Sequence, residues 1–393
     1  MKRWCSFFSN RNEVLYATIP DLIDPKRRAH LFDGTPVRYL TKEGIYYPDS
    51  FTGRVRIAAR IVDGTKNIVS AHALQASCLK IVPDTASSPL RLLFQFAYLD
   101  RVRRLVSEEN PDLVEGHYLF PYGVLAAFSR HRRIVACTWG SDVLVDCVHY
   151  SYYRMLAMRV FEKAVFIHGP STALKRRALK LGCPEEKFFV VPWGADLELF
   201  KPQNRGKEIR TKYGIPGDAP VIISCRHLEP LYRINEIIEG FALVKKKLPE
   251  ARLMILDDGT EKAKLLSLCK DLGISDSVHF TGTIPHEQLP FFLTASDVYA
   301  QMPISDGLPV SLQEAMACGL PVITSNVGGN REAVCGNGFF ANDHLELAEK
   351  VLLILNKNLD KDLGKISRQI AEKRYNRKEN MAKMEMLYRR FIL

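Results

Sequence analysis

Two series of short apolar runs, separated by a segment without regular periodicity, limit the folds open to this chain of 393 residues. The first series is Leu79–Val82, Asp112–Gly116, Arg133–Thr138, Ala164–Gly169 and Phe188–Pro192, and the second is Val221–Cys225, Arg252–Leu256, Val278–Gly282, Asp297–Gln301 and Pro321–Ser325. Short apolar runs that alternate with helical segments are typical of parallel strands buried on both faces. The sequence therefore predicts an α/β fold with two Rossmann-like, doubly wound parallel-sheet domains.

The segment between the two series, Val190–Pro202, contains proline, tryptophan and glycine. We interpret it as a hinge between the domains. Doubly wound sheets bind ligands at the C-terminal ends of their strands. We therefore expect the two sheets to face a central cleft.

The most specific motif lies at residues 305–334. Ser311 followed three residues later by Glu314 predicts a capping box, and Gly319 predicts the end of the helix. The helix is therefore expected to begin at Val310 or Ser311. The first amides of such a helix have no partners within it, and they form an anion site suited to a diphosphate.

Two carboxylates, Asp306 and Glu314, flank this predicted anion site. They would repel a phosphate, but an ionised carboxylate accepts hydrogen bonds from the vicinal hydroxyls of a ribose or hexose. The combination predicts a nucleotide-sugar site. The alternatives are structural: a plain helix cap for Glu314 and a turn residue for Asp306.

The segment 305–334 resembles the donor-site signature of retaining glycosyltransferases of family 4, which have the B-type fold. In that signature two glutamates stand eight positions apart. Glu314 matches the second glutamate, whereas Asp306 occupies the place of the first with a side chain one methylene shorter. Val190–Pro202 is similar to the family's interdomain linker, and Phe280–Pro303 is similar to the part that holds the base.

The resemblance implies roles for residues of the second domain. Arg226 stands where the family has its diphosphate-binding arginine, and Arg233 is the cation nearest to the position of a family lysine. The predicted catalytic residues, all electrostatic in action, are Arg226, Arg233, Asp306 and Glu314; the predicted donor-binding residues are Thr283, Asp306, Gly307, Leu308, Val310, Ser311 and Glu314. In the family a leaving phosphate oxygen takes the acceptor's proton, so the resemblance implies no separate base, no cofactor and no metal.

The first domain offers candidates after two of its predicted strands. The predicted acceptor-side or cleft-lining residues are His117, Gly140, Ser141 and Asp142. The alternative for His117 is a structural histidine. Many relatives have a histidine where Trp139 stands, and residues 1–60 show no counterpart of the family's first strand and paired-glycine loop.

We expect an N-terminal acceptor-side domain at residues 1–193, a donor domain at 194–372 and a C-terminal helix at 373–393 that packs back on the N-terminal domain.

The net charge is distributed unevenly along the chain. Residues 1–195 carry a net charge of +10, residues 196–350 carry −5 and the remainder carries +6. A positive first domain favours an anionic membrane surface over nucleic acid as a partner, because nucleic-acid-binding motifs are absent from the sequence.

The nine cysteines are scattered without a C-x-x-C pair, which indicates a reducing compartment without disulfides or structural zinc. With no apolar run as long as a membrane span, we expect a cytoplasmic protein, peripheral on the inner face of the cell membrane. The predicted activity is retaining transfer of a hexose from a nucleoside-diphosphate sugar to a hydroxyl of a glycan or lipid-linked acceptor. The alternatives are a catalytically weakened binding protein of the same fold and a nucleotide-sugar epimerase.

Overall fold

The computed structural model describes residues 14–17, 39–41, 44–46, 68–71, 99–203 and 206–392. The chain forms two compact units: residues 1–191 with 381–393, and residues 192–380. Each unit contains a parallel sheet of six strands, which confirms the predicted α/β fold. The predicted strand Leu79–Val82 lies outside the described residues.

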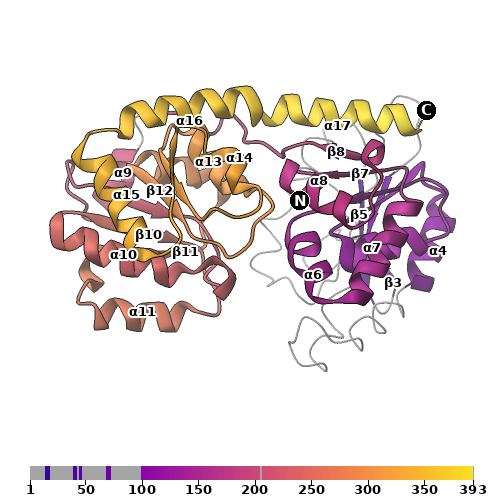
Figure 1. Ribbon diagram of the computed structural model, residues 1–393, viewed down its shortest axis with the longest axis horizontal. Coiled ribbons are helices and arrows are strands. Elements are labelled where there is room, and N and C mark those ends of the chain that lie inside the picture. Colours follow the sequence, from indigo (N-terminus) through magenta and orange to yellow (C-terminus); the bar gives the residue numbers. More distant parts are fainter. Residues whose placement is uncertain are drawn as a thin grey trace. The chain divides into compact units, whose positions relative to one another are not determined.

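The sheet of the first unit has the order β1-β4-β5-β6-β7-β8, with all pairs parallel. Figure 1 labels β5, β7 and β8 of this sheet. Its strands are β1 (Val14–Ala17), β4 (Ile68–Ala71), β5 (Leu113–His117), β6 (Ile134–Cys137), β7 (Phe166–Gly169) and β8 (Phe188–Val190); β2 (Tyr39–Thr41) and β3 (Gly44–Tyr46) form a separate antiparallel pair. Strand β1 corrects the expectation that residues 1–60 lack a first strand. Its four residues are too short a run to stand out from their neighbours.

Helices follow the strands of the first unit. They are α4 (Leu99–Glu109), α5 (Val124–Phe128), α6 (Cys147–His149), α7 (Ser151–Lys163) and α8 (Thr172–Lys180). Helix α7 buries Tyr153, Leu156, Ala157 and Val160, whose three- and four-residue spacing puts them on one face. Tyr388 and Phe391 of the C-terminal helix, α17 (Arg377–Ile392), pack against Phe166 in β7.

The sheet of the second unit has the order β11-β10-β9-β12-β13-β14, again with all pairs parallel. Its strands are β9 (Val221–Ser224), β10 (Arg252–Leu256), β11 (Val278–Gly282), β12 (Val298–Gln301), β13 (Val322–Thr324) and β14 (Gly338–Phe340). The strand order turns from one direction to the other between β9 and β12. In doubly wound sheets this switch point is where ligands bind.

The helices of the second unit begin with α9 (Gly206–Lys212), α10 (Ile234–Lys247), α11 (Lys262–Asp271) and α12 (Leu289–Thr294). They continue with α13 (Val310–Ala317), α14 (Asn330–Ala333), α15 (His344–Asn356) and α16 (Asp360–Arg374). Helix α13 ends as predicted, because Gly319 adopts φ 79° and its N–H donates to the Met316 carbonyl.

Candidate functional site

Two of the predicted catalytic residues, Arg226 and Asp306, meet at the switch point of the second sheet. Arg226 comes two residues after β9, and Asp306 lies in the loop between β12 and α13. Strands β9 and β12 are direct neighbours, with Tyr299 opposite Ile223. The C-terminal ends of two adjacent parallel strands therefore deliver an arginine and an aspartate to one place.

Arg226 forms an ion pair with Asp306, with 2.6 Å between Nη2 and Oδ2. Its Nη1 donates to Ser311 Oγ at 3.3 Å, and the guanidinium lies 4.2 Å from the centre of the Tyr232 ring. The side chains of Arg226 and Asp306 are each 12% exposed. The arginine is thus held by a carboxylate, a hydroxyl and an aromatic face without being sealed from solvent.

Burial and the opposite charge of the partner both shift the pKa values of Arg226 and Asp306. Burial raises the pKa of Asp306, an effect that the Arg226 guanidinium opposes. Burial also acts to lower the pKa of Arg226, but the Asp306 carboxylate, Tyr299 and Tyr232 together outweigh it and the pKa is raised. The Arg226 guanidinium therefore stays positively charged beside the start of α13.

Helix α13 begins at Val310, one of the two predicted starts, but the predicted capping box is wrong. Pro309 is the N-cap residue, and no side chain caps the helix. Ser311 lies inside the first turn, where its Oγ accepts from Arg226 and from the Tyr299 hydroxyl at 3.0 Å. The serine is therefore part of the site and has no capping role.

Glu314 is also engaged differently from a capping residue. Its Oε1 lies 2.8 Å from Nε2 of His286, and the glutamate side chain is only 1% exposed. The His286 side chain is 27% exposed, and its ring packs on Phe200. His286 was not predicted as a site residue from the sequence. The available signal was its position within Phe280–Pro303, the segment similar to the part of the family that holds the base.

The loop between β12 and α13 contacts a glycine turn from the next strand. The Gly329 N–H donates to the Asp306 carbonyl at 3.2 Å, and a Cβ at Gly329 would collide with the Gly307 carbonyl. The N–H of Leu308 faces Asp306 Oδ1 at 3.4 Å. Only glycine at position 329 allows this approach, so the glycine turn shapes the loop that carries Asp306.

Two further donor-domain candidates have other contacts. Arg233 donates from Nε to the Met302 carbonyl at 2.9 Å and from Nη1 to the Asn342 carbonyl at 3.2 Å. Thr283 Oγ1 donates to Asp257 Oδ1 at 2.8 Å. The neighbour that contacts the Arg226 guanidinium is thus Tyr232, and the described contacts of Arg233 are to backbone.

In the first unit the predicted residues surround the ends of β5 and β6. His117 is the last residue of β5 and is buried, with its ring edge-to-face against Trp139 at 6.2 Å. Gly140 is buried in extended conformation, and Ser141 Oγ is 2.9 Å from the Tyr118 hydroxyl. These residues form one cluster because β5 and β6 are adjacent, with His117 opposite Cys137.

Asp142 serves the backbone of the turn around it. Its carboxylate accepts from the N–H groups of Leu119, Trp139, Gly140 and Val143 at 2.9 to 3.2 Å. The residue is fully buried, and burial raises its pKa while these N–H groups oppose the rise. The carboxylate therefore stabilises the turn, a structural role that the prediction of an acceptor-side or cleft-lining residue did not include.

Two family models match the chain. The model described as Glycosyl transferases group 1 matches residues 206–374, and the one described as Glycosyl transferase 4-like domain matches residues 67–194. The chain belongs to the group 1, family 4 glycosyltransferases. This family membership agrees with the resemblance found in the sequence.

Two relatives illustrate how far the similarity extends. A GDP-mannose-dependent alpha-(1-6)-phosphatidylinositol monomannoside mannosyltransferase from Mycolicibacterium smegmatis is 29% identical over 60% of this chain and 63% of its own length. N-acetyl-alpha-D-glucosaminyl L-malate synthase from Bacillus anthracis is 22% identical over 75% of this chain and 79% of its own. The first match thus spans under two thirds of that relative.

Two solved structures share the fold. HepE from Anabaena in complex with UDP superposes with a TM-score of 0.67 at 20% identity, over 81% of this chain and 91% of that one. Sucrose-phosphate synthase from Thermosynechococcus elongatus gives a TM-score of 0.69 at 18% identity, over 96% and 98%. The two parallel-sheet units are those of the B-type fold.

Proposed function

We propose that the protein is a retaining, metal-independent hexosyltransferase that uses a nucleoside-diphosphate sugar as donor. The observation that carries the proposal is the group formed by Arg226, Asp306 and Ser311 at the start of α13. A guanidinium and the free amides of a helix start both stabilise a departing diphosphate. Relatives with nucleotide-sugar ligands, such as HepE with UDP-glucose, support the donor class.

In the proposed reaction the donor diphosphate binds between Arg226 and the first amides of α13. As the bond from the anomeric carbon to the diphosphate breaks, Arg226 compensates the growing negative charge on the phosphate oxygens. A phosphate oxygen takes the proton of the attacking hydroxyl, so no protein base is required. Glu314 with His286 is proposed to bind the ribose hydroxyls, and Asp306 to orient Arg226 and contact the sugar.

Metal independence is supported by the contacts of the two carboxylates in the acidic turn after β10. Asp257 is engaged by His227 at 2.9 Å and by Thr283 at 2.8 Å, and Asp258 is paired with Lys262 at 2.9 Å. These carboxylates already have partners. Arg226 supplies the positive charge that a metal provides to diphosphates in other enzymes.

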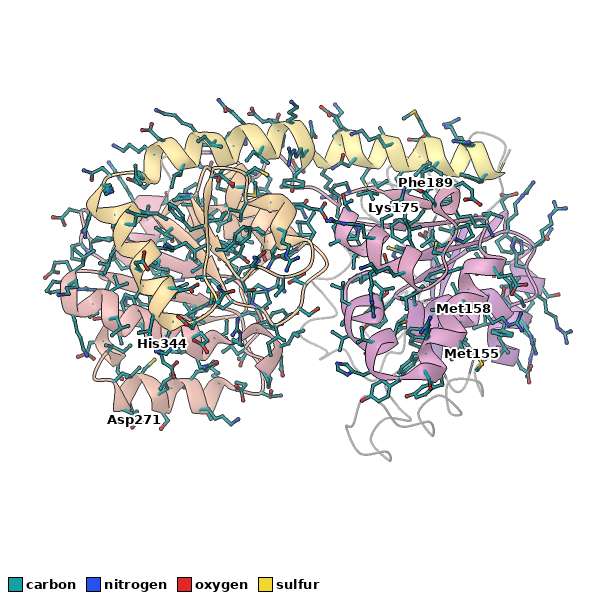
Figure 2. All side chains as sticks on the ribbon, viewed as in Figure 1. Met155, Met158, Lys175, Phe189, Asp271 and His344 are labelled. Carbon is teal, nitrogen blue, oxygen red and sulfur yellow. The ribbon has the colours of Figure 1, made fainter. Side chains whose placement is uncertain are left out.

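The acceptor is proposed to be a glycan or lipid-linked hydroxyl at the inner face of the cell membrane. Helix α7 exposes Met155 by 60% and Met158 by 50%, between the exposed Arg154 and Arg159 (Figure 2). Methionine side chains flanked by arginines suit an anionic lipid surface. None of the helices in the described part of the chain is long and apolar enough to cross a membrane.

Donor turnover tests the function. The full chain is incubated with UDP-, GDP- and ADP-hexoses, with and without lipid-linked acceptors, and nucleotide release and the anomeric configuration of the product are measured. Transfer with retained configuration supports the proposal, and an inverted product contradicts the mechanism. Turnover of the sugar without acceptor would favour the epimerase, and no turnover of any donor would favour the binding protein.

Flotation tests the membrane part separately. The wild-type chain is mixed with anionic liposomes at low and high salt, beside a variant with Met155→Gln and Met158→Gln. Wild-type flotation that weakens in salt and in the variant is expected. No flotation of the wild type at either salt concentration would remove the membrane claim.

A further inference from the structure

A fully buried carboxylate connects the predicted acceptor-side histidine with the C-terminal helix. Glu115, on β5, has no exposed surface. His168 Nε2 donates to Glu115 Oε1 at 2.6 Å, and the Tyr388 hydroxyl donates to Glu115 Oε2 at 2.6 Å. His117 Nε2 lies 3.4 Å from the same Oε2. All four side chains are buried, and they belong to β5, β7 and α17 of the first unit.

The strands explain why these groups meet. Glu115 and His117 are two positions apart on β5, so both side chains project from the same face of the sheet. His168 reaches this face from β7, the second strand along. Tyr388 comes from a distant part of the sequence, and its ring packs on Phe166. The next turn of α17 brings Phe391 against Phe166 and Phe189. Figure 2 shows Phe189 beside this helix.

The carboxylate is kept ionised in spite of its burial. Burial alone would raise the pKa of Glu115, but His117 and His168 outweigh it and hold the pKa well below its ordinary value. A buried carboxylate needs hydrogen-bond donors around it, and removing one donor leaves part of its charge uncompensated. The positions of His117, His168 and Tyr388 are therefore coupled through Glu115.

We propose that Glu115 and Tyr388 are positioning residues for His117. His117 ends β5 and contacts Trp139, so it is the member of the network that adjoins the predicted acceptor-side turn. Glu115 fixes the imidazole, and Tyr388 holds the carboxylate from the other side. A residue of the C-terminal helix thereby becomes part of the first unit's functional site. The proposal rests on the proposed function for the role of His117 in transfer.

A purely structural anchor would give the same contacts, so the test needs a matched pair on α17. Tyr388→Phe removes only the hydroxyl and keeps the ring on Phe166. Phe391→Leu weakens the packing of the same helix on Phe166 and Phe189 and leaves the hydrogen bond to Glu115 intact. An anchor predicts equal or larger effects for Phe391→Leu, whereas positioning predicts a functional effect for Tyr388→Phe alone.

The first readout is steady-state transfer by the full chain. A buried hydrogen bond to a charged group commonly contributes about tenfold or more to an equilibrium or rate. We expect Tyr388→Phe to lower kcat about tenfold with an unchanged KM for the donor, and Phe391→Leu to keep kcat within about twofold. Glu115→Gln, which keeps the shape and removes the charge, should lower kcat at least as much as Tyr388→Phe.

The second readout does not depend on activity. The full chain is labelled with ¹⁵N-histidine, and the imidazole signals of His117 are assigned by their loss in His117→Gln. Tyr388→Phe is expected to shift the His117 signals, and Phe391→Leu is expected to leave them in place. Unshifted His117 signals in Tyr388→Phe, or shifted signals with an unchanged kcat, would overturn the proposal. An inactive wild type would refute the proposed function, while the shifts would still decide whether the coupling exists.

Discussion

The two units differ in how they surround a charged side chain. In the second unit, Arg226 and Asp306 form a pair that is partly exposed, with a serine and a tyrosine around it. In the first unit, Glu115 is fully enclosed by two histidines and Tyr388. A partly open pair can exchange one partner for a ligand, whereas a closed network can only hold its members in place. The partly exposed pair is thus suited to binding a ligand, and the buried network is suited to positioning its own side chains.

The closed network should show its effect first in stability. Glu115→Ala removes the acceptor of the His168 and Tyr388 hydrogen bonds and the ion-pair partner of His117, and breaking a buried charged network costs about 3–5 kcal/mol of unfolding free energy. Urea denaturation of the full chain at pH 7 measures the loss. Glu115→Gln should lose less, because its amide oxygen still accepts a hydrogen bond. A loss below about 1 kcal/mol for Glu115→Ala would contradict the closed network.

The same variant has a pH signature. The pKa of Glu115 is lowered on folding, so its stabilising contribution is present above the ordinary value of 4.5 and is lost as the pH falls below it. The difference in unfolding free energy between wild type and Glu115→Gln should therefore shrink as the pH is lowered from 6 toward 3. A difference that is constant over this range would show that the carboxylate charge is unimportant.

The open pair should show its effect in turnover. Arg226→Ala is expected to lower kcat at least a hundredfold, because removing a preorganised donor from a developing anion costs about 3–4 kcal/mol. Arg226→Lys keeps the charge but loses the planar fork, and it should recover part of the rate. Arg233→Ala serves as the comparison and should cost less, since Arg233 donates to the Met302 and Asn342 carbonyls. Activity of Arg226→Ala within threefold of wild type would refute its role.

Asp306 should give an intermediate effect. Asp306→Asn keeps the size of the side chain but removes the charge that holds Arg226, and we expect kcat to fall about tenfold, as for loss of one charged hydrogen bond. Asp306→Glu restores the length found in the family signature and should keep more activity than Asp306→Asn. Steady-state kinetics of the three chains decides this. Equal rates for wild type and Asp306→Asn would show that the carboxylate does not position Arg226.

The smallest effect is expected at the turn next to Arg226. The hydrogen bond to Asp257 raises the pKa of His227, more than burial lowers it. This contribution to stability is present below the ordinary value of 6.5 and is lost as the pH rises through the folded-state value. Because His227 is more than half exposed, the pair should contribute only about 0.2–1 kcal/mol. Urea denaturation of Asp257→Asn at pH 5.5 and pH 8.5 should show a larger loss at the lower pH.

Most strands of the second sheet could be predicted from the sequence, because parallel strands buried on both faces consist of uninterrupted apolar runs. β9 to β13 were all predicted, whereas β14, a three-residue strand that begins with Gly338, was missed. Arg226 could be predicted because it follows a recognisable strand, and the start of α13 was predicted from the spacing of Ser311 and Glu314. The capping box could not be tested by spacing alone, since Ser311 bonds to Tyr299 and Arg226 from other elements.

The Glu115 network was beyond the sequence for a different reason. The spacing of Glu115 and His117 on a strand does indicate two side chains on one face. The partners that complete the network are His168, two strands away, and Tyr388, which is 273 positions from Glu115. Only the fold brings such distant residues together. Long-range polar networks are therefore the part of the site that sequence patterns leave open.

Nucleotide binding tests the central claim, that the open pair is a nucleoside-diphosphate-sugar site. Thermal unfolding of the full chain is measured with UDP, GDP and ADP, for wild type and Arg226→Ala. At about 100 times its dissociation constant, the correct nucleotide should stabilise the wild type by about 2.7 kcal/mol. The same concentration should stabilise Arg226→Ala much less. Equal stabilisation of both chains, or none of the wild type by any of the three nucleotides, would contradict the claim.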